Sequence, residues 1–254
     1  MAETRKKLSE KLKHYRALKK QRGMTLLEII IVLGIIGTIA AGVVVLAQRA
    51  YDSKSMTDLT TNINTLRTAI KEAYGPTGIY PLPEGDATAA LNDQNITETA
   101  GQATPIGKLI ALGKISRDEA KNNISSDFVS FGAGDISANG IQKGYFIEIN
   151  GLNREQCRNV LLQAGNSFDY VQTVTGDASG SYSVNNTSVN LYAALTGVTA
   201  GTAATATAPA TPSVLAGQGI FRSLVTGGNT LITADGVVGA CSDNSNNGII
   251  LGSR

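Results

Sequence analysis

Nineteen consecutive residues without a charged side chain, from Ile29 to Ala47, constrain this 254-residue chain more than any other feature. At 1.5 Å per residue they would form a helix about 28 Å long, close to the hydrocarbon thickness of a bilayer. This run is too long for a cleaved secretory signal peptide, and it continues directly into a polar helical pattern. A single membrane anchor fits the length, but it leaves Glu28, the one ionisable residue after Met24 in this stretch, without a partner.

The charged residues are distributed unevenly along the chain. Residues 1–23 hold nine basic and two acidic side chains, and the other 231 residues hold 13 basic and 18 acidic ones. The basic segment is expected to stay on the cytoplasmic side of a membrane, with the C-terminal part outside. Because the basic excess lies in one tail, the sequence pI near 8.5 does not indicate a nucleic-acid partner.

The composition lacks the side chains of the common catalytic and metal centres. The only His is His14, inside the basic tail, and the chain has two Cys and no Trp. A histidine-based zinc site and a Ser-His-Asp triad therefore lack their parts outside the tail. We find no catalytic, cofactor-binding or metal-binding motif and expect a non-enzymatic protein without a cofactor. The 28 Gly and 17% charged residues suit a loop-rich extracellular domain.

The string RGMTLLEIIIVLGIIGTIAAG resembles the processing site and hydrophobic stem of type IV pilins and of type II secretion pseudopilins. The shared pattern is a basic leader, a glycine, an apolar residue, and a glutamate at the fifth mature position before an apolar run. The resemblance implies that prepilin peptidase cuts between Gly23 and Met24 on the cytoplasmic face and methylates the Met24 amine. Residues 1–23 would then be a leader peptide that is removed.

The 23-residue leader and Met24 as first mature residue resemble the type IVb subclass. The segments AQRAYDS, GIYP, LGKISRDEAKN and NGLNREQCRNVL also resemble type IVb colonisation-factor pilins of enteric pathogens. The resemblance implies a major pilus subunit, stored in the inner membrane with its head in the periplasm. The inner-membrane assembly machinery would polymerise it into an extracellular helical homopolymer for adhesion, microcolony formation and colonisation. A minor pilin or a pseudopilin is the alternative within the same fold.

One helix of about fifty residues, roughly 75 Å long, is expected to run from Met24 to Gly75. Residues 24–47 would be its transmembrane and assembly part. Residues 48–75 would be amphipathic, because an apolar stripe recurs at intervals of three and four residues. Gly75-Pro76 ends the pattern. The stripe consists of Met56, Leu59, Ile63, Leu66, Ile70 and Ala73.

Residues 76–254 are expected to form an α+β head. The pilin fold, which the resemblance implies, lays the long helix against an antiparallel sheet. Residues 143–150, 170–175 and 248–251 are predicted strands, and 153–164 a helix. Ser116 and Glu119 have capping-box spacing and predict the start of a short helix. We expect no regular structure in 75–107 and a surface loop in the Thr- and Ala-rich segment 196–212.

The remaining candidate functional residues are two cysteines and three charged groups. In an extracytoplasmic compartment Cys157 and Cys241 are expected to pair, two buried free thiols being the alternative. In pilins such a bond bounds the C-terminal variable region. Glu28 is expected to meet the Met24 amine of a neighbouring subunit in the apolar fibre core, since an unpaired carboxylate there is costly. Arg49 and Glu119 form a proposed second, peripheral pair between subunits, with solvated charges as the alternative.

Overall fold

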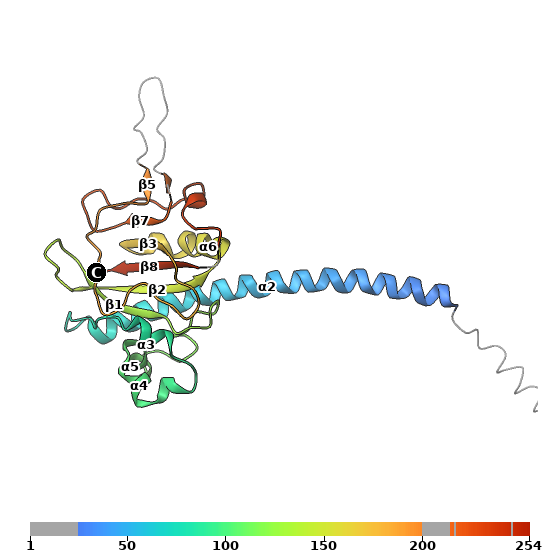
Figure 1. The fold of residues 1–254 in the computed structure, drawn as a ribbon, viewed down its shortest axis with the longest axis horizontal. Helices are drawn as coiled ribbons and strands as arrows, with labels where there is room; N and C mark the ends of the chain where they lie inside the picture. Colours follow the sequence, from blue (N-terminus) through green and yellow to red (C-terminus); the bar gives the residue numbers. More distant parts are fainter. Residues whose placement is uncertain (1–24, 200–213, 216, 245) are drawn as a thin grey trace, which may run out of the picture. The chain divides into compact units, whose positions relative to one another are not determined.

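The computed structural model describes residues 25–199, 214–215, 217–244 and 246–254 (Figure 1). The chain forms two compact units, Met1–Asp52 and Ser53–Arg254. The long helix that the sequence predicts is confirmed as α2, Leu26–Tyr74. It ends where predicted, because Gly78 adopts a φ of +62° and its amide donates to the carbonyl of Tyr74 at 2.9 Å. A residue without a Cβ accepts this left-handed conformation at little cost.

The second half of α2 belongs to the head and supplies one wall of its core. The predicted stripe is buried, from 0% exposure for Leu59 to 7% for Met56, except that Ala73 is only partly buried. Two cations on the flank of this face lie over aromatic rings. The Arg67 guanidinium is 4.9 Å from the ring centroid of Phe168, and the Lys71 ammonium is 5.7 Å from that of Tyr145. Each such contact contributes about 0.5–1 kcal/mol.

The main sheet has six strands in the order β4-β1-β2-β8-β3-β7. All neighbouring strands are antiparallel except β1 and β4, which are parallel, so the expected antiparallel sheet is in fact mixed at this edge. β5 and β6 form a separate antiparallel pair. The strands are β1 (Ser130–Asp135), β2 (Gly144–Leu152), β3 (Tyr170–Thr175), β4 (Val189–Asn190), β5 (Val198–Thr199), β6 (Val214–Leu215), β7 (Gly219–Arg222) and β8 (Asn247–Ser253).

Shorter helices surround the sheet. α3, α4 and α5 lie beside the β1 edge, and α6 lies with α2 on one side of the sheet (Figure 1). The α-helices after α2 are α3 (Gly85–Ala89), α4 (Thr99–Ala103), α5 (Pro105–Ala111) and α6 (Arg154–Ala164), and the 3-10 helices are η1 (Asn95–Thr97), η2 (Gly165–Ser167) and η3 (Gly236–Gly239). α6 begins with a capping box, in which Asn153 and Gln156 bond each other's backbone amides.

The two faces of the sheet have different covers. Tyr145, Ile147 and Ile149 of β2 face the main core with α2 and α6, whereas Phe146 and Ile250 face a second, smaller core. Side chains of the segment 176–193 complete this second core. Close approach is possible because β8 has glycines here: a Cβ on Gly248 would lie 2.0 Å from Asp177 Oδ2, and one on Gly252 would lie 2.5 Å from Leu191.

Two local predictions from the sequence are wrong. The stretch 75–107 is not irregular, because it holds α3, η1, α4 and the start of α5. These elements have only three to seven residues each, too few to show a helical period in the sequence. Thr104 caps α5 by accepting from the Gly107 amide at 3.2 Å. Ser116 and Glu119 make their capping bonds, but they close a turn and not a helix, because Lys121 then pairs in a β-bridge with Phe128. Of the predicted loop 196–212, residues 200–212 lie outside the described residues.

Candidate assembly helix and disulfide-bounded region

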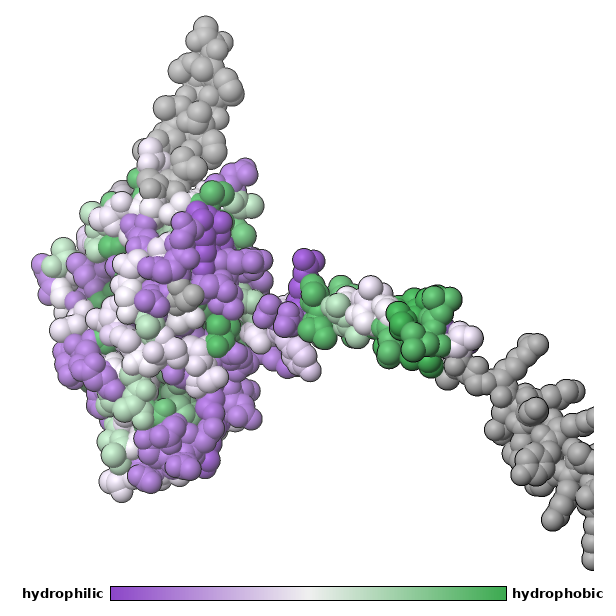
Figure 2. Space-filling model, turned by 45° about the vertical axis from the view of Figure 1, so that its right-hand side comes forward, coloured by the Kyte–Doolittle hydropathy of each residue, from purple (hydrophilic) through white to green (hydrophobic). Residues whose placement is uncertain are grey.

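The first half of α2 presents apolar side chains that nothing in its own unit covers. The large apolar side chains between Leu26 and Leu46 are all exposed, from 37% for Ile29 to 78% for Leu26. Figure 2 shows hydrophobic patches on this part of the helix, separated by near-neutral residues. Burying each such side chain contributes about 1.5–3 kcal/mol. α2 is also long and apolar enough to cross a membrane, with a mean hydropathy of 3.0 over its most apolar 18 residues. This half of the helix therefore requires lipid or other apolar helices around it.

Glu28 lies in the first turn of α2, where its backbone amide donates to Thr25 Oγ1 at 3.3 Å. A carboxylate in the first turn is favoured by the helix dipole by about 0.3–1 kcal/mol. No cation lies within ion-pair distance of Glu28 in the described part of the chain. Gly23 and Met24, the residues of the expected processing site, lie outside the described residues. The expected pairing of Glu28 with the Met24 amine therefore stays a prediction.

Arg49 and Glu119 have different local surroundings. Arg49 is an exposed residue of α2 and takes part in none of the ion pairs within the described ranges. Glu119 Oε2 accepts from the Ser116 hydroxyl at 2.5 Å and from the Ser116 amide at 3.0 Å. These two bonds, the side-chain bond first, hold the pKa of the Glu119 carboxyl below its usual range. Glu119 is therefore an ionised hydrogen-bond acceptor that closes the turn after Ser116. A contact with another subunit would be a second role of this side chain.

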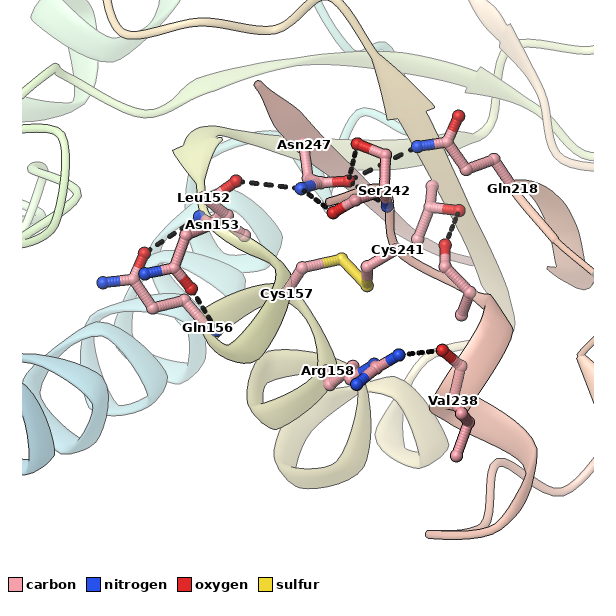
Figure 3. The surroundings of a disulfide bond; sticks show 12 residues. Leu152, Asn153, Gln156, Cys157, Arg158, Gln218, Val238, Cys241, Ser242 and Asn247 are labelled. Carbon is pink, nitrogen blue, oxygen red and sulfur yellow. Dashed lines mark hydrogen bonds between the residues drawn. A yellow bond between two sulfur atoms is a disulfide. The ribbon is translucent and has the colours of Figure 1, made fainter. Parts of the chain in front are cut away.

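The two cysteines form the predicted disulfide. Cys157 on α6 and Cys241, two residues after η3, are both buried and bonded, with Cα atoms 6.2 Å apart and a separation of 84 positions in sequence. Figure 3 shows a polar contact beside the bond, where the Arg158 guanidinium donates to the Val238 carbonyl. The closed loop contains β3, β4 and β7 of the main sheet. The bond therefore ties helix α6 to the chain that enters β8.

Asn247 is a structural residue that the sequence reasoning missed. Its side chain is fully buried at the start of β8, next to the disulfide (Figure 3). Its Nδ2 donates to the carbonyls of Leu152 at 3.1 Å and Asn244 at 2.8 Å, and its Oδ1 accepts from the Ser242 amide at 2.8 Å. One amide thus joins β2, β8 and the turn after Cys241. In the sequence, the only sign of this structural role is that Asn247 directly follows the turn-forming string Ser242–Asn246.

Two buried acids also escaped the sequence reasoning. Glu148, on β2, is fully buried, and Asp177 is 2% exposed. Burial and the neighbouring Asp177 charge raise the pKa of Glu148 to about 9. No sequence pattern marks this pair, because the two residues are 29 positions apart on separate elements.

Among the described residues no group of three or more His, Cys, Asp or Glu is arranged to hold a metal ion. Three open surface hollows are lined by polar residues from α2, from the turn after Ser116 and from the β3–β7 edge. Lys, Ser, Thr and carboxylate side chains are among the residues that line these hollows, and neither histidine nor cysteine is. The arrangement instead offers an apolar helix for association and a cross-linked head.

Comparisons with known proteins agree with this arrangement. Residues 18–44 match the family model for the prokaryotic N-terminal methylation motif. The toxin coregulated pilin of Vibrio cholerae is 38% identical over 178 residues, which cover 70% of this chain and 73% of the relative. The protein of the same name from V. cholerae serotype O1 is 37% identical over 158 residues, covering 61% and 63%.

The solved structures include a neighbour with the same fold. The crystal structure of TcpA, a type IV pilin from the El Tor biotype of V. cholerae, aligns with a TM-score of 0.55 at 20% identity, covering 79% of this chain and 99% of the pilin. The methylation motif, the apolar helix and the identity to a pilin over most of its length have one common explanation. This chain belongs to the type IVb pilins, as a relative of the toxin coregulated pilin.

Proposed function

We propose that this protein is the major structural subunit of a type IVb pilus. The observation that carries the proposal is the 38% identity to toxin coregulated pilin over 178 residues, which cover 70% of this chain and 73% of that pilin. A subunit of this kind is held in the inner membrane by α2, with its head in the periplasm. The assembly machinery then moves it into a helical homopolymer, where neighbouring helices replace lipid around the apolar surface.

The proposed processing of the precursor and the proposed functions of the fibre follow from membership in the type IVb pilins. Prepilin peptidase removes residues 1–23 by cutting between Gly23 and Met24, and the Met24 amine is methylated. The fibre then serves adhesion, microcolony formation and colonisation. The role is structural, which fits relatives that are pilins and not enzymes.

Sheared surface filaments test the proposal directly. Mass spectrometry of the dominant filament protein should show a chain that starts at N-methylated Met24. Gly23→Leu should accumulate as full-length precursor in the membrane. Gly34→Leu is the matched control, because a Cβ at Gly34 meets nothing within 4 Å and the position lies outside the cleavage site.

Two outcomes would contradict the proposal. An intact leader in assembled filaments would exclude the processing step. A chain that is processed but forms only a trace of the filament mass would be a minor pilin, or a pseudopilin if deletion abolishes protein secretion instead of piliation.

A further inference from the structure

The loop of residues 176–184 is fixed to the sheet by acidic side chains. It lies on the sheet face opposite α2, where Tyr182 and Val184 are buried. Asp127 Oδ2 accepts from the Gly180 amide at 2.7 Å and from the Ser179 hydroxyl at 3.1 Å. The Asn150 amide also holds the loop, because its Nδ2 donates to the carbonyls of Ala178 at 3.2 Å and Ser181 at 3.1 Å. Polar groups therefore contribute to the attachment together with the buried Tyr182 and Val184.

Glu148 of β2 makes the deepest of these attachments, and Asp177, which belongs to the loop itself, binds the same Ser183. Glu148 Oε1 accepts from the Ser183 amide at 2.8 Å, and its Oε2 lies 3.3 Å from the Val184 amide. Asp177 Oδ1 accepts from the Ser183 hydroxyl. The second oxygen, Asp177 Oδ2, is buried without a hydrogen-bond partner. An unsatisfied buried carboxylate oxygen is costly, and each such case calls for a specific explanation.

The charges around this pair make two ionised carboxylates unfavourable. The Tyr182 phenol, from the loop itself, lies near Glu148, Asp177 and also Asp127, from the segment before β1; burial first, and then these three carboxylates, raise the pKa of Tyr182. No Lys, Arg or His of the described residues forms an ion pair with Glu148 or Asp177. Two buried like charges without a cation normally retain a proton between them.

We propose that Glu148 and Asp177 bind one shared proton at neutral pH, with the Glu148 carboxyl donating to Asp177 Oδ2, and that this proton holds the 176–184 loop on the sheet. The shared proton supplies the partner that Oδ2 otherwise lacks. Its loss leaves two like charges side by side beneath the loop. The loop then separates from the sheet and exposes the apolar side chains of the second core, among them Phe146 and Ile250.

The pH dependence has a definite sign. Burial first, and then the Asp177 charge, raise the pKa of Glu148 from its ordinary 4.5 to about 9, and burial also raises the pKa of Asp177. The unfolded chain loses this proton above about pH 4.5, and the folded chain keeps it to about pH 9. The folded state therefore holds one more proton in this window. The stabilisation is complete below pH 4.5, and the unfolding equilibrium constant rises about tenfold per pH unit up to pH 9.

Infrared spectroscopy of the full-length chain in detergent tests whether the shared proton is present, independently of any measurement of stability. At pH 7 the wild-type spectrum should contain the carbonyl stretch of a buried protonated carboxyl group, which disappears on titration towards pH 10. Glu148→Gln should lack this band and still fold, because the amide can accept from Ser183 and donate to Asp177 as the protonated acid does. Hydrogen exchange of amides 176–184, corrected for intrinsic rates, measures the opening of the loop at alkaline pH. In Glu148→Gln this opening should be absent.

Asp127→Asn is the matched control, since it removes one negative charge from the same cluster. Asp127 accepts three hydrogen bonds as a carboxylate, so its replacement should loosen the loop at every pH while the infrared band remains. The proposal is overturned if the wild type has no such band at pH 7, or if Glu148→Gln opens with the pH dependence of the wild type. Loss of the band on adding millimolar Ca²⁺ at pH 7, with a raised melting temperature, would show that a cation occupies the pair instead.

Discussion

At the scale of single residues, Glu28 is the group whose surroundings must change most on assembly. In the isolated chain it lies in the first turn of α2 without an ion-pair partner among the described residues. Among packed apolar helices an unpaired carboxylate is costly, and under the proposed processing the N-terminal amine of a neighbour would be the available cation. A short-range attraction of this kind, strengthened by apolar surroundings, would set the axial stagger between subunits.

Glu28→Val should therefore yield a chain that inserts, is processed and folds, yet forms few or no pili. Electron microscopy of cells and immunoblots of membrane and sheared fractions measure both parts. Asp52→Val is the control, because it removes an exposed carboxylate from the same helix beyond the apolar run. Normal piliation by Glu28→Val would exclude the docking role.

The proposed pair of Arg49 and Glu119 needs a test that separates charge from local structure. Arg49→Glu should reduce pilus number, and adding Glu119→Arg should restore part of it, as counted by electron microscopy. Glu119 also binds Ser116, so its replacement weakens the turn. Ser116→Ala is the control, because it removes the side-chain bond and keeps both charges. A double variant no better than Arg49→Glu alone would contradict the pair.

At the scale of elements, the disulfide and helix α6 act together. The bond closes a loop of 84 residues, for which the chain-entropy model gives about 4 kcal/mol. It joins α6 to the segment from which β8 starts, and Asn247 fixes the same segment through its amide. These contacts attach the closed region to α6 and β8.

Loss of the bond should be severe. Cys157→Ser, Cys241→Ser or both should destabilise the head by about 2–5 kcal/mol and lower its steady-state level, measured by immunoblot of whole cells. Ser167→Ala, whose hydroxyl donates to the Ala164 carbonyl at the end of the same helix, is the control for a small change there. Peptide mapping without reduction should recover the linked pair, and a wild-type level in both single variants would contradict this role.

Local patterns predicted some elements well and others not at all. The stripe from Met56 to Ile70 and the strand 170–175 have clear periods, and both elements were predicted. β1 was missed because its sequence, SFGAGD, contains glycines that leave room for Pro83 and Leu191 and so weaken its apolar alternation. The parallel pairing of β4 with β1 and the Glu148–Asp177 pair depend on contacts between distant segments, which no local pattern records.

At the scale of the whole molecule, the sequence contains two parts that need different surroundings to bury their apolar side chains. The apolar half of α2 requires an environment outside its own unit, and the head contains its own core. Membership in the type IVb pilins was predictable from the processing motif, the long leader, the apolar helix and several segments of the head. The order of the strands was not, because pairing across the sheet is decided by packing of the whole head.

The central place of β8 in that order has a consequence for how the protein is made. β8 lies between β2 and β3, although both precede it in the chain. While the chain emerges, β2 and β3 each keep an unpaired backbone edge, and such edges readily pair with other chains. During biogenesis each membrane-anchored subunit must therefore pass through a period in which its head is incompletely folded and these strand edges are exposed. For the proposed head in the periplasm, formation of the Cys157–Cys241 disulfide would also fall in this interval, before the subunit is assembled.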